Sequence, residues 1–175
     1  MAEQATDCAA RLARTKSGYE TDDLLSQYLS LHFGPMEAAF AEFAAETGIL
    51  ASALDFPKKC GLLVNAWQAK TGSASGRALD LGCAVGGSTF ELAKTYGAVI
   101  GIDLSQRFID AAADMAASKQ IKYQLKVEGE LTERLVARLD PDVDTSRVQF
   151  MQVGWLQGRA LLPAMAAWAA ISPRR

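Results

Sequence analysis

The stretch Asp80-Leu81-Gly82-Cys83-Ala84-Val85-Gly86 is the most informative part of this sequence for its fold class. It continues a short, mostly apolar run that starts at Arg77, and it leads into a helical pattern over residues 88–96. An apolar run that enters a glycine-rich turn and then a helix predicts a strand, a loop and a helix in that order.

The same unit is repeated directly afterwards. Residues 98–102 form a second continuous apolar run that ends in Asp103, and Ser105 can cap a helix with an apolar stripe. Residues 148–153 predict a further strand. Apolar strands joined by helices predict an α/β fold with a parallel sheet, covered on both faces and connected by right-handed crossovers.

Four regions are expected along the chain: a poorly ordered lead-in (1–18), a helical cap (19–76), a Rossmann-like core (77–153) and an atypical tail (154–175). The cap pattern predicts three helices: one capped by Asp22 and ended by Gly34-Pro35, one over 36–47, and one over 58–70 that presents Leu62, Leu63, Ala66 and Trp67 together. Phe40, Phe43 and Trp67 are expected in the core.

Within residues 77–153, a half-exposed strand or extended insert is expected over 121–127 and a helix over 130–139.

Composition excludes several classes of function. The 175 residues carry 18 Lys+Arg against 20 Asp+Glu, a formal charge of −2. The chain therefore lacks the excess of positive charge that binding to nucleic acids or anionic membranes requires. Its three cysteines and one histidine have no metal-ligand spacing, and the cysteines are typical of reduced thiols. No signal peptide or membrane-spanning run is visible, and a cytoplasmic protein without a metal is therefore expected.

The glycine loop and Asp103 together indicate an adenosine-containing ligand. Gly82 and Gly86 let the backbone turn tightly and approach a bound group, while the next helix offers its N-terminal amides. Asp103 ends the second strand about twenty residues further on, where a carboxylate accepts hydrogen bonds from both hydroxyls of a ribose.

Asp80 separates two candidate ligands. A dinucleotide site reads G-x-G-x-x-G because its amides meet a pyrophosphate, and a carboxylate beside the loop repels that group. A carboxylate instead accepts hydrogen bonds from an ammonium or from loop amides. The sequence therefore favours S-adenosylmethionine, with NAD as the alternative.

Two of these segments resemble a known family. Residues 80–86 and Gly101-Ile102-Asp103-Leu104-Ser105 resemble motifs one and two of class I S-adenosylmethionine methyltransferases, with Ala84 in place of the usual middle glycine. Further segments extend this similarity to the methyltransferase module of ovothiol biosynthesis, a family described as 4-mercaptohistidine N1-methyltransferases. They are Tyr19-Glu20-Thr21, 27–34, Phe56-Pro57, 79–86, 101–109 and Glu128-Gly129-Glu130-Leu131.

The resemblance implies a set of site residues. The expected cofactor contacts are Asp80, Gly82, Cys83, Ala84 and Gly86 around the methionine part, and Asp103 and Leu104 near the ribose. Tyr19, Glu20 and His32 are candidate substrate contacts; a surface role for the first two and a packing role for His32 are the alternatives. An imidazole nitrogen would attack the methyl carbon in line, a reaction that proximity and alignment accelerate without a catalytic base.

The chain departs from the family pattern after Phe150. Family members continue into a Gly-Asp-Ala segment and further strands of a seven-stranded sheet, whereas Val153-Gly154-Trp155-Leu156 stands here. We therefore expect an incomplete methyltransferase sheet, from a truncated or frame-shifted reading near Val153. A non-catalytic remnant that self-associates through the edge of strand 148–153 is the alternative to an active enzyme.

Overall fold

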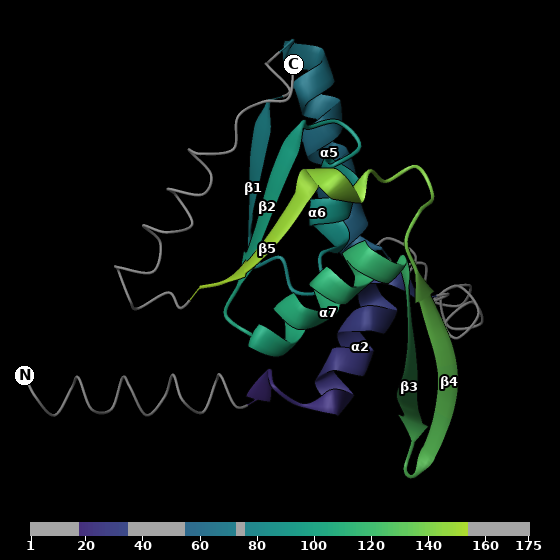
Figure 1. The fold of residues 1–175 in the computed structure, drawn as a ribbon. Coiled ribbons are helices and arrows are strands. Elements are labelled where there is room, and N and C mark those ends of the chain that lie inside the picture. Colours follow the sequence, from purple (N-terminus) through teal and green to yellow (C-terminus); the bar gives the residue numbers. More distant parts are fainter. Residues whose placement is uncertain (1–17, 35–54, 73–75, 154–175) are drawn as a thin grey trace, which may run out of the picture.

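The computed structural model of the protein describes residues 18–34, 55–72 and 76–153 (Figure 1). Its elements are α2 (Asp22–Phe33), α5 (Phe56–Thr71), β1 (Arg77–Leu81), α6 (Gly87–Leu92), β2 (Ala98–Asp103), α7 (Gln106–Ser118), β3 (Gln120–Glu128), β4 (Leu131–Arg138), the 3-10 helix Thr145–Arg147 and β5 (Val148–Gln152). The predicted lead-in up to residue 17, the helix over 36–47 with Phe40 and Phe43, and the tail over 154–175 lie outside the described residues.

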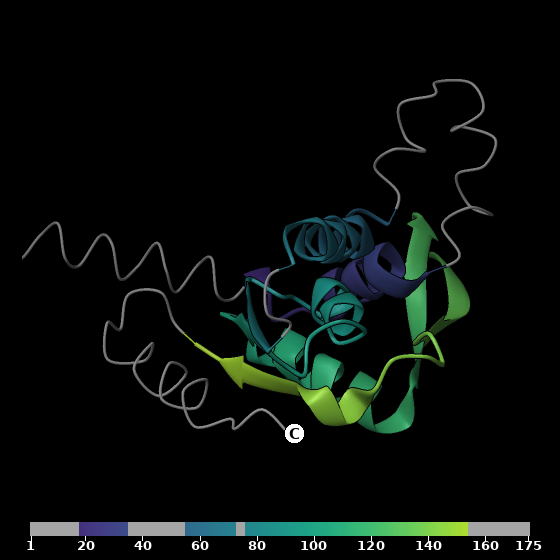
Figure 2. The same cartoon turned by 90° about the horizontal axis from the view of Figure 1, so that it is seen from above.

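A parallel sheet with the order β1-β2-β5 forms the centre of the fold, which confirms the predicted α/β class. Gly101 of β2 lies level with Asp80 of β1 on one side and with Phe150 of β5 on the other. Seen from above, α6 lies against this sheet and α5 packs on the outer side of α6 (Figure 2). The carboxyl ends of β1 and β2 thus meet at one edge, where the glycine loop begins.

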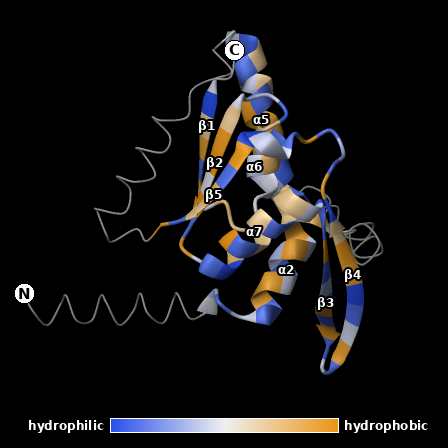
Figure 3. Cartoon of the chain, viewed as in Figure 1, coloured by the Kyte–Doolittle hydropathy of each residue, from blue (hydrophilic) through white to orange (hydrophobic). Residues whose placement is uncertain are grey.

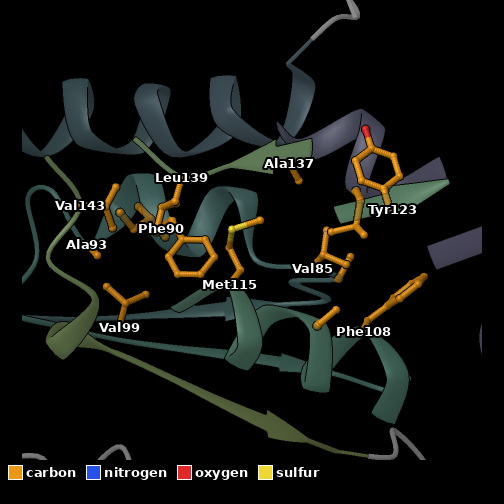
Figure 4. Packing of buried hydrophobic residues seen from close by; sticks show 14 residues of the cluster. Val85, Phe90, Ala93, Val99, Phe108, Met115, Tyr123, Ala137, Leu139 and Val143 are labelled. Carbon is orange, nitrogen blue, oxygen red and sulfur yellow. The ribbon is translucent and has the colours of Figure 1, made fainter. Parts of the chain in front are cut away.

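The core lies between the sheet and the helices. Figure 4 shows side chains from β2, α6, α7 and the β3–β4 hairpin in one cluster. Its fully buried members include Val85, Phe90, Val99, Phe108 and Met115. Because strand, loop and helix all contribute to this cluster, packing fixes the position of the glycine loop.

β2 needs a glycine at its centre. A Cβ at Gly101 would lie 2.8 Å from Thr89 Oγ1, 2.9 Å from Cys83 Sγ and 2.9 Å from Phe150 Cδ1. The absent side chain lets α6 and the loop lie close to the strand.

The antiparallel pairing of β3 with β4 corrects one prediction: a helix was expected over 130–139, but Leu131–Arg138 form a strand. Gly129 turns the chain with a φ of +54°. Polar and apolar residues follow each other along β3 (Figure 3), and Tyr123 of that strand is buried with its hydroxyl 3.3 Å from Ser30 Oγ of α2. Pairing with β3 and packing on α2 outweigh the helix propensity of Glu, Arg, Leu and Ala in this segment.

The apolar face expected on α5 is also wrong. Trp67 is 66% exposed and Leu63 is 71% exposed, so neither lies in the core. The helix contacts α6 through another face, where Asn65 Nδ2 donates to Glu91 O at 2.9 Å and a Cβ at Gly61 would lie 2.7 Å from Glu91 Cβ. A backbone approach this close admits glycine and excludes the large apolar side chains.

α2 ends as predicted, but it begins differently. Gly34 follows its last residue and donates its N–H to Ser30 O at 2.8 Å. The N-cap is Thr21 rather than Asp22, because the Thr21 hydroxyl accepts the N–H of Leu24 at 3.3 Å. Asp22 is the first residue of the helix, where an acid is favourable to the helix dipole.

β1 and β5 are the two edges of the sheet in the part of the chain that the structure describes. On β1, Leu79 is 39% exposed and Leu81 is 53% exposed.

None of the helices in residues 18–34, 55–72 and 76–153 has the length and apolar character needed to cross a membrane.

Candidate functional site

The loop after β1 is held tightly to the end of β2. The N–H groups of Gly82 and Cys83 both donate to Ile102 O, at 2.8 and 3.0 Å, and Gly86 N donates back to Cys83 O at 2.8 Å. Gly82 has a φ of +77° and Gly86 a φ of +93°, which is the left-handed region that glycine adopts without strain. The loop therefore presents backbone rather than side chains at the carboxyl end of β1.

Ala84 occupies the third left-handed position of this loop, with a φ of +47°. That conformation costs a residue with a Cβ about 1–2 kcal/mol. Its N–H donates to Asp103 Oδ2 at 2.9 Å, a charge-assisted bond that favours the strained turn. The middle position of the motif thus keeps its conformation although its glycine is replaced.

Asp103 connects the two motifs. Besides the bond from Ala84, its other oxygen accepts the N–H of Ser105 at 2.9 Å. Each carboxylate oxygen can accept a second hydrogen bond, so the side chain is fixed in place and still able to bind a ligand hydroxyl. Leu104 is held through its carbonyl, which accepts from Gln152 Nε2 at 2.8 Å.

Asp80 is partly buried and accepts the hydroxyl of Thr89 at 2.7 Å. Burial raises the pKa of the Asp80 carboxyl above its usual value; the Thr89 hydrogen bond opposes this shift, and the negative charge of Asp103 adds to it. Two acidic side chains near one loop make this end of the sheet electronegative, and a cation bound there would favour the ionised form of Asp80.

A cavity of about 340 Å³ opens at this point. Its walls are formed by Tyr19, Tyr28, Gly82, Ala84, Asp103, Leu104 and Phe108. Among these described residues Asp103 is the only charged one, and three others are aromatic. A larger cavity of about 740 Å³ lies between α2 and the β3–β4 hairpin, but no residue of the two motifs lines it. We place the candidate site at the smaller cavity because the motif residues converge there.

Aromatic rings form one wall of this cavity. The ring of Phe108 lies 4.5 Å from that of Tyr28 and 6.0 Å from that of Tyr19, measured between centroids. Burial raises the pKa of the Tyr28 hydroxyl, with smaller contributions from Tyr19 and Asp103. Tyr28 and Phe108 were not among the predicted site residues, because their helical spacing is equally typical of core positions.

The three candidate substrate contacts are separated in the structure. Tyr19 lines the cavity, but both carboxylate oxygens of Glu20 accept backbone N–H groups at the start of α7. His32 is buried, and its Nδ1 accepts the N–H of Gly87 at 3.0 Å. Burial lowers the pKa of His32 to about 4, so the imidazole is neutral at pH 7. This geometry corresponds to a packing histidine that fixes α2 to the start of α6.

Of the predicted cofactor contacts, Gly82, Ala84, Asp103 and Leu104 line the cavity, whereas Asp80, Cys83 and Gly86 do not. Cys83 is buried, and burial raises the pKa of its thiol, which stays protonated. Gly86 serves the packing of α6, since a Cβ there would lie 2.9 Å from both Phe90 Cε2 and Phe150 Cζ.

The donor set fits one class of cofactor. A carboxylate at the end of β2 suits the two hydroxyls of a ribose, and aromatic faces beside it attract a cation. No Lys or Arg is found among the described residues that line the cavity, so the negative charge of a pyrophosphate would meet only Asp103. The residues thus fit a nucleoside that carries positive charge.

Comparisons with known proteins agree with this assignment. A family described as "Methyltransferase domain" matches residues 78–169, more than half of the chain, and the match continues past Val153, where the sequence pattern was expected to break. A curated relative, phosphoethanolamine N-methyltransferase 1 of Triticum aestivum, is 29% identical over 128 residues, which is 73% of this chain. The chain spans about a quarter of that relative's length, 24%.

A solved structure is also similar. It is the crystal structure of an S-adenosylmethionine-dependent methyltransferase from Clostridium acetobutylicum ATCC 824. The two chains are 20% identical, the match covers 47% of this chain and 32% of that one, and the TM-score is 0.35.

Proposed function

The chain belongs to the methyltransferase domain family. We propose that it transfers a methyl group from S-adenosylmethionine to a ring nitrogen of a 4-mercaptohistidine-like substrate. The cavity at the glycine loop supports the cofactor, and the sequence of the segments around α2 supports the acceptor.

One observation supports the cofactor most directly: the cavity at the glycine loop combines a single carboxylate with aromatic walls. S-adenosylmethionine supplies an activated methyl group on a sulfonium, and it also carries a ribose and an ammonium. Asp103 would accept the ribose hydroxyls, and Tyr19, Tyr28 and Phe108 would face positive charge with their rings. Gly82 and Ala84 would let the methionine part approach the backbone.

The chain's own contribution to the reaction is alignment. The acceptor nitrogen needs a free lone pair and an approach in line with the bond that breaks, and a cavity that holds cofactor and acceptor side by side would supply this alignment. Aromatic walls serve this purpose without taking up a proton. The pKa of the Tyr28 hydroxyl is raised by burial, so this group stays protonated and is suited to hydrogen bonding rather than to general base catalysis at pH 7.

The sequence supports the choice of acceptor. The segments Tyr19-Glu20-Thr21, 27–34 and Glu128-Gly129-Glu130-Leu131 resemble the methyltransferase module of ovothiol biosynthesis. In the structure, segment 19–21 precedes α2 and supplies the cavity residue Tyr19. Segment 27–34 includes the second half of α2 and supplies Tyr28. The name of the relative from Triticum aestivum, phosphoethanolamine N-methyltransferase 1, also denotes methylation of a nitrogen. Both similarities support transfer to a nitrogen, but they imply different acceptor molecules, 4-mercaptohistidine and phosphoethanolamine.

A methyl-transfer assay with three acceptors tests this proposal. The purified full chain is incubated with S-adenosylmethionine and either 4-mercaptohistidine, histidine or phosphoethanolamine, and the products are analysed by mass spectrometry. We expect methylation of 4-mercaptohistidine above the other two, and none with Asp103→Ala. Preferential methylation of phosphoethanolamine would overturn the acceptor and leave the cofactor assignment intact. Cofactor binding with no methylated product from any acceptor would favour the non-catalytic remnant.

A further inference from the structure

We propose that residues 19–22 form a latch that fastens to the first turn of α7 and thereby positions the aromatic wall of the cofactor cavity. This inference rests on the proposed function, since it assigns the latch a role in holding S-adenosylmethionine. Glu20 is its central member. In Figure 1 the chain that leads into α2 lies beside the first turn of α7, where the latch contacts are made.

Four contacts join the latch to α7, across more than eighty residues of sequence. Ser105 Oγ donates to the carbonyl of Tyr19 at 3.1 Å. Glu20 accepts the N–H of Gln106 on Oε1 at 3.1 Å and that of Arg107 on Oε2 at 3.2 Å. Asp22 forms an ion pair with the guanidinium of Arg107. Both carboxylate oxygens of Glu20 thus accept backbone N–H groups at the start of α7.

The latch supplies what α7 itself lacks. The first four N–H groups of a helix have no partner within it, and a negative charge there is favourable to the helix dipole. α7 has no acidic residue in its first turn, and Ser105 satisfies only the N–H of Phe108 at 3.1 Å. Glu20 provides the missing acceptors for the two preceding N–H groups from a distant part of the chain.

The consequence for the cavity follows from what flanks these contacts. Tyr19 precedes Glu20 and faces the cavity, while Ser105 follows the cavity residues Asp103 and Leu104 directly. The ring of Tyr19 lies edge-on to Phe108 at 6.0 Å and to Tyr28 at 6.5 Å. Fastening residue 20 to α7 therefore sets where the Tyr19 ring lies relative to the other two rings. Glu20 is a positioning residue, and it acts through Tyr19.

The experiment compares Glu20→Ala with wild type in the full chain. By calorimetry we expect about a tenfold weaker affinity for S-adenosylmethionine, since two charge-assisted bonds to the helix are lost. Glu20→Gln keeps an acceptor oxygen and should recover part of the affinity. Asp114→Ala removes an exposed acid from the same helix and should bind as wild type does. In turnover, KM for the cofactor should rise while kcat at saturation stays within about twofold of the wild-type value.

A second measurement reports on the latch without any ligand. Hydrogen exchange at the amides of Gln106 and Arg107 should be faster in Glu20→Ala and unchanged in Asp114→Ala. Faster exchange together with wild-type cofactor affinity would overturn the positioning role and leave the proposed function standing. Failure of wild type to bind S-adenosylmethionine would overturn the proposed function itself. Should Glu20→Ala fail to fold, Glu20→Gln provides the comparison, because it removes the charge and keeps the side chain: weaker affinity for S-adenosylmethionine with faster exchange at Gln106 and Arg107 supports the latch, and wild-type affinity with faster exchange overturns its positioning role.

Discussion

The backbone N–H of Ala84 donates to Asp103 Oδ2 at 2.9 Å, so the glycine loop after β1 is bonded directly to the acid that ends β2. The second oxygen of that carboxylate accepts the N–H of Ser105 at 2.9 Å. One side chain therefore fixes the loop, the start of α7 and one wall of the cavity. Loss of that side chain should affect both folding and ligand binding.

Replacing Asp103 by alanine should abolish measurable binding of S-adenosylmethionine. It also leaves two backbone N–H groups without their acceptor, and we expect the free energy of unfolding to fall by about 1–3 kcal/mol. Asp103→Asn keeps one acceptor oxygen and should lose less stability. Urea unfolding and calorimetry on the same preparations measure the two effects. Wild-type affinity in the alanine variant would remove Asp103 from the site.

Ala84 should tolerate glycine but not valine. The φ of +47° at this position suits glycine, so Ala84→Gly should change the free energy of unfolding by less than about 1 kcal/mol, because relief of strain offsets the lost methyl contacts. A β-branched side chain is a genuine outlier in this region, and Ala84→Val should cost about 2–3 kcal/mol. Thermal or urea unfolding gives both values. Equal stability of the two variants would contradict the left-handed conformation.

His32 should make the protein less stable in mild acid. Burial lowers the pKa of its imidazole from 6.5 to about 4 in the folded protein. The unfolded chain therefore binds a proton between these values while the folded protein does not, and stability is lost as the pH falls from 6.5 towards 4, by up to about 3 kcal/mol.

The comparison for His32 is a glutamine variant, whose carbonyl can still accept the N–H of Gly87. Urea unfolding of both proteins at a series of pH values between 7.5 and 4.5 should give a steeper decline for wild type, on the order of 1 kcal/mol per pH unit in the middle of the range. Carboxylates elsewhere titrate equally in both proteins and cancel in the difference. Parallel curves would show that the imidazole is not the buried neutral group described above.

Lys94 should be important for stability because it joins the end of α6 to the segment that follows β4. Its ammonium lies 2.8 Å from Asp140, 3.1 Å from Glu91 and 3.4 Å from Asp142. Burial lowers the pKa of Lys94, but hydrogen bonds to Asp140 and Glu91 outweigh this effect and raise it above its usual value. Lys94→Met leaves the buried Glu91 without its cation, and we expect a loss of about 2 kcal/mol.

A matched control exists on the β3–β4 hairpin. Lys126 lies 3.5 Å from Glu130, whose side chain is 99% exposed, and a pair of this kind contributes little in water. Lys126→Met should therefore leave the melting temperature unchanged, while Lys94→Met lowers it. Equal melting temperatures for the two variants would show that the Lys94 network does not stabilise the fold.

The sequence predicted those parts of the fold that depend on neighbouring residues. The strand and glycine loop after Arg77 formed as expected, and Ser105 caps α7 by accepting the N–H of Phe108. The helix predicted over 88–96 is present as α6 but ends at Leu92. In each of these segments, hydrophobic periodicity, glycine positions and capping residues lie within a few residues of one another. The cavity residues Gly82, Ala84 and Asp103 belong to the same segments.

Contacts between distant residues decided the rest. Glu133 and Arg134 are good helix formers, yet they lie in a strand because β4 pairs with β3. Trp67 is exposed because Gly61, rather than the apolar side chains, meets α6. The two N–H groups that donate to Glu20 belong to residues far along the chain. No local sequence pattern shows that these N–H groups lack a partner within their own helix. Such partners are found only when the elements are placed in space.

Calorimetric titration of the full chain shows whether the cavity beside Asp103 binds S-adenosylmethionine. S-adenosylmethionine should release heat with a single-site isotherm, and Asp80→Asn should weaken that binding, because Asp80 contributes negative charge near the loop. NAD, titrated under the same conditions, should give no heat of binding. Binding of NAD with no binding of S-adenosylmethionine would show that the cavity is a dinucleotide site instead.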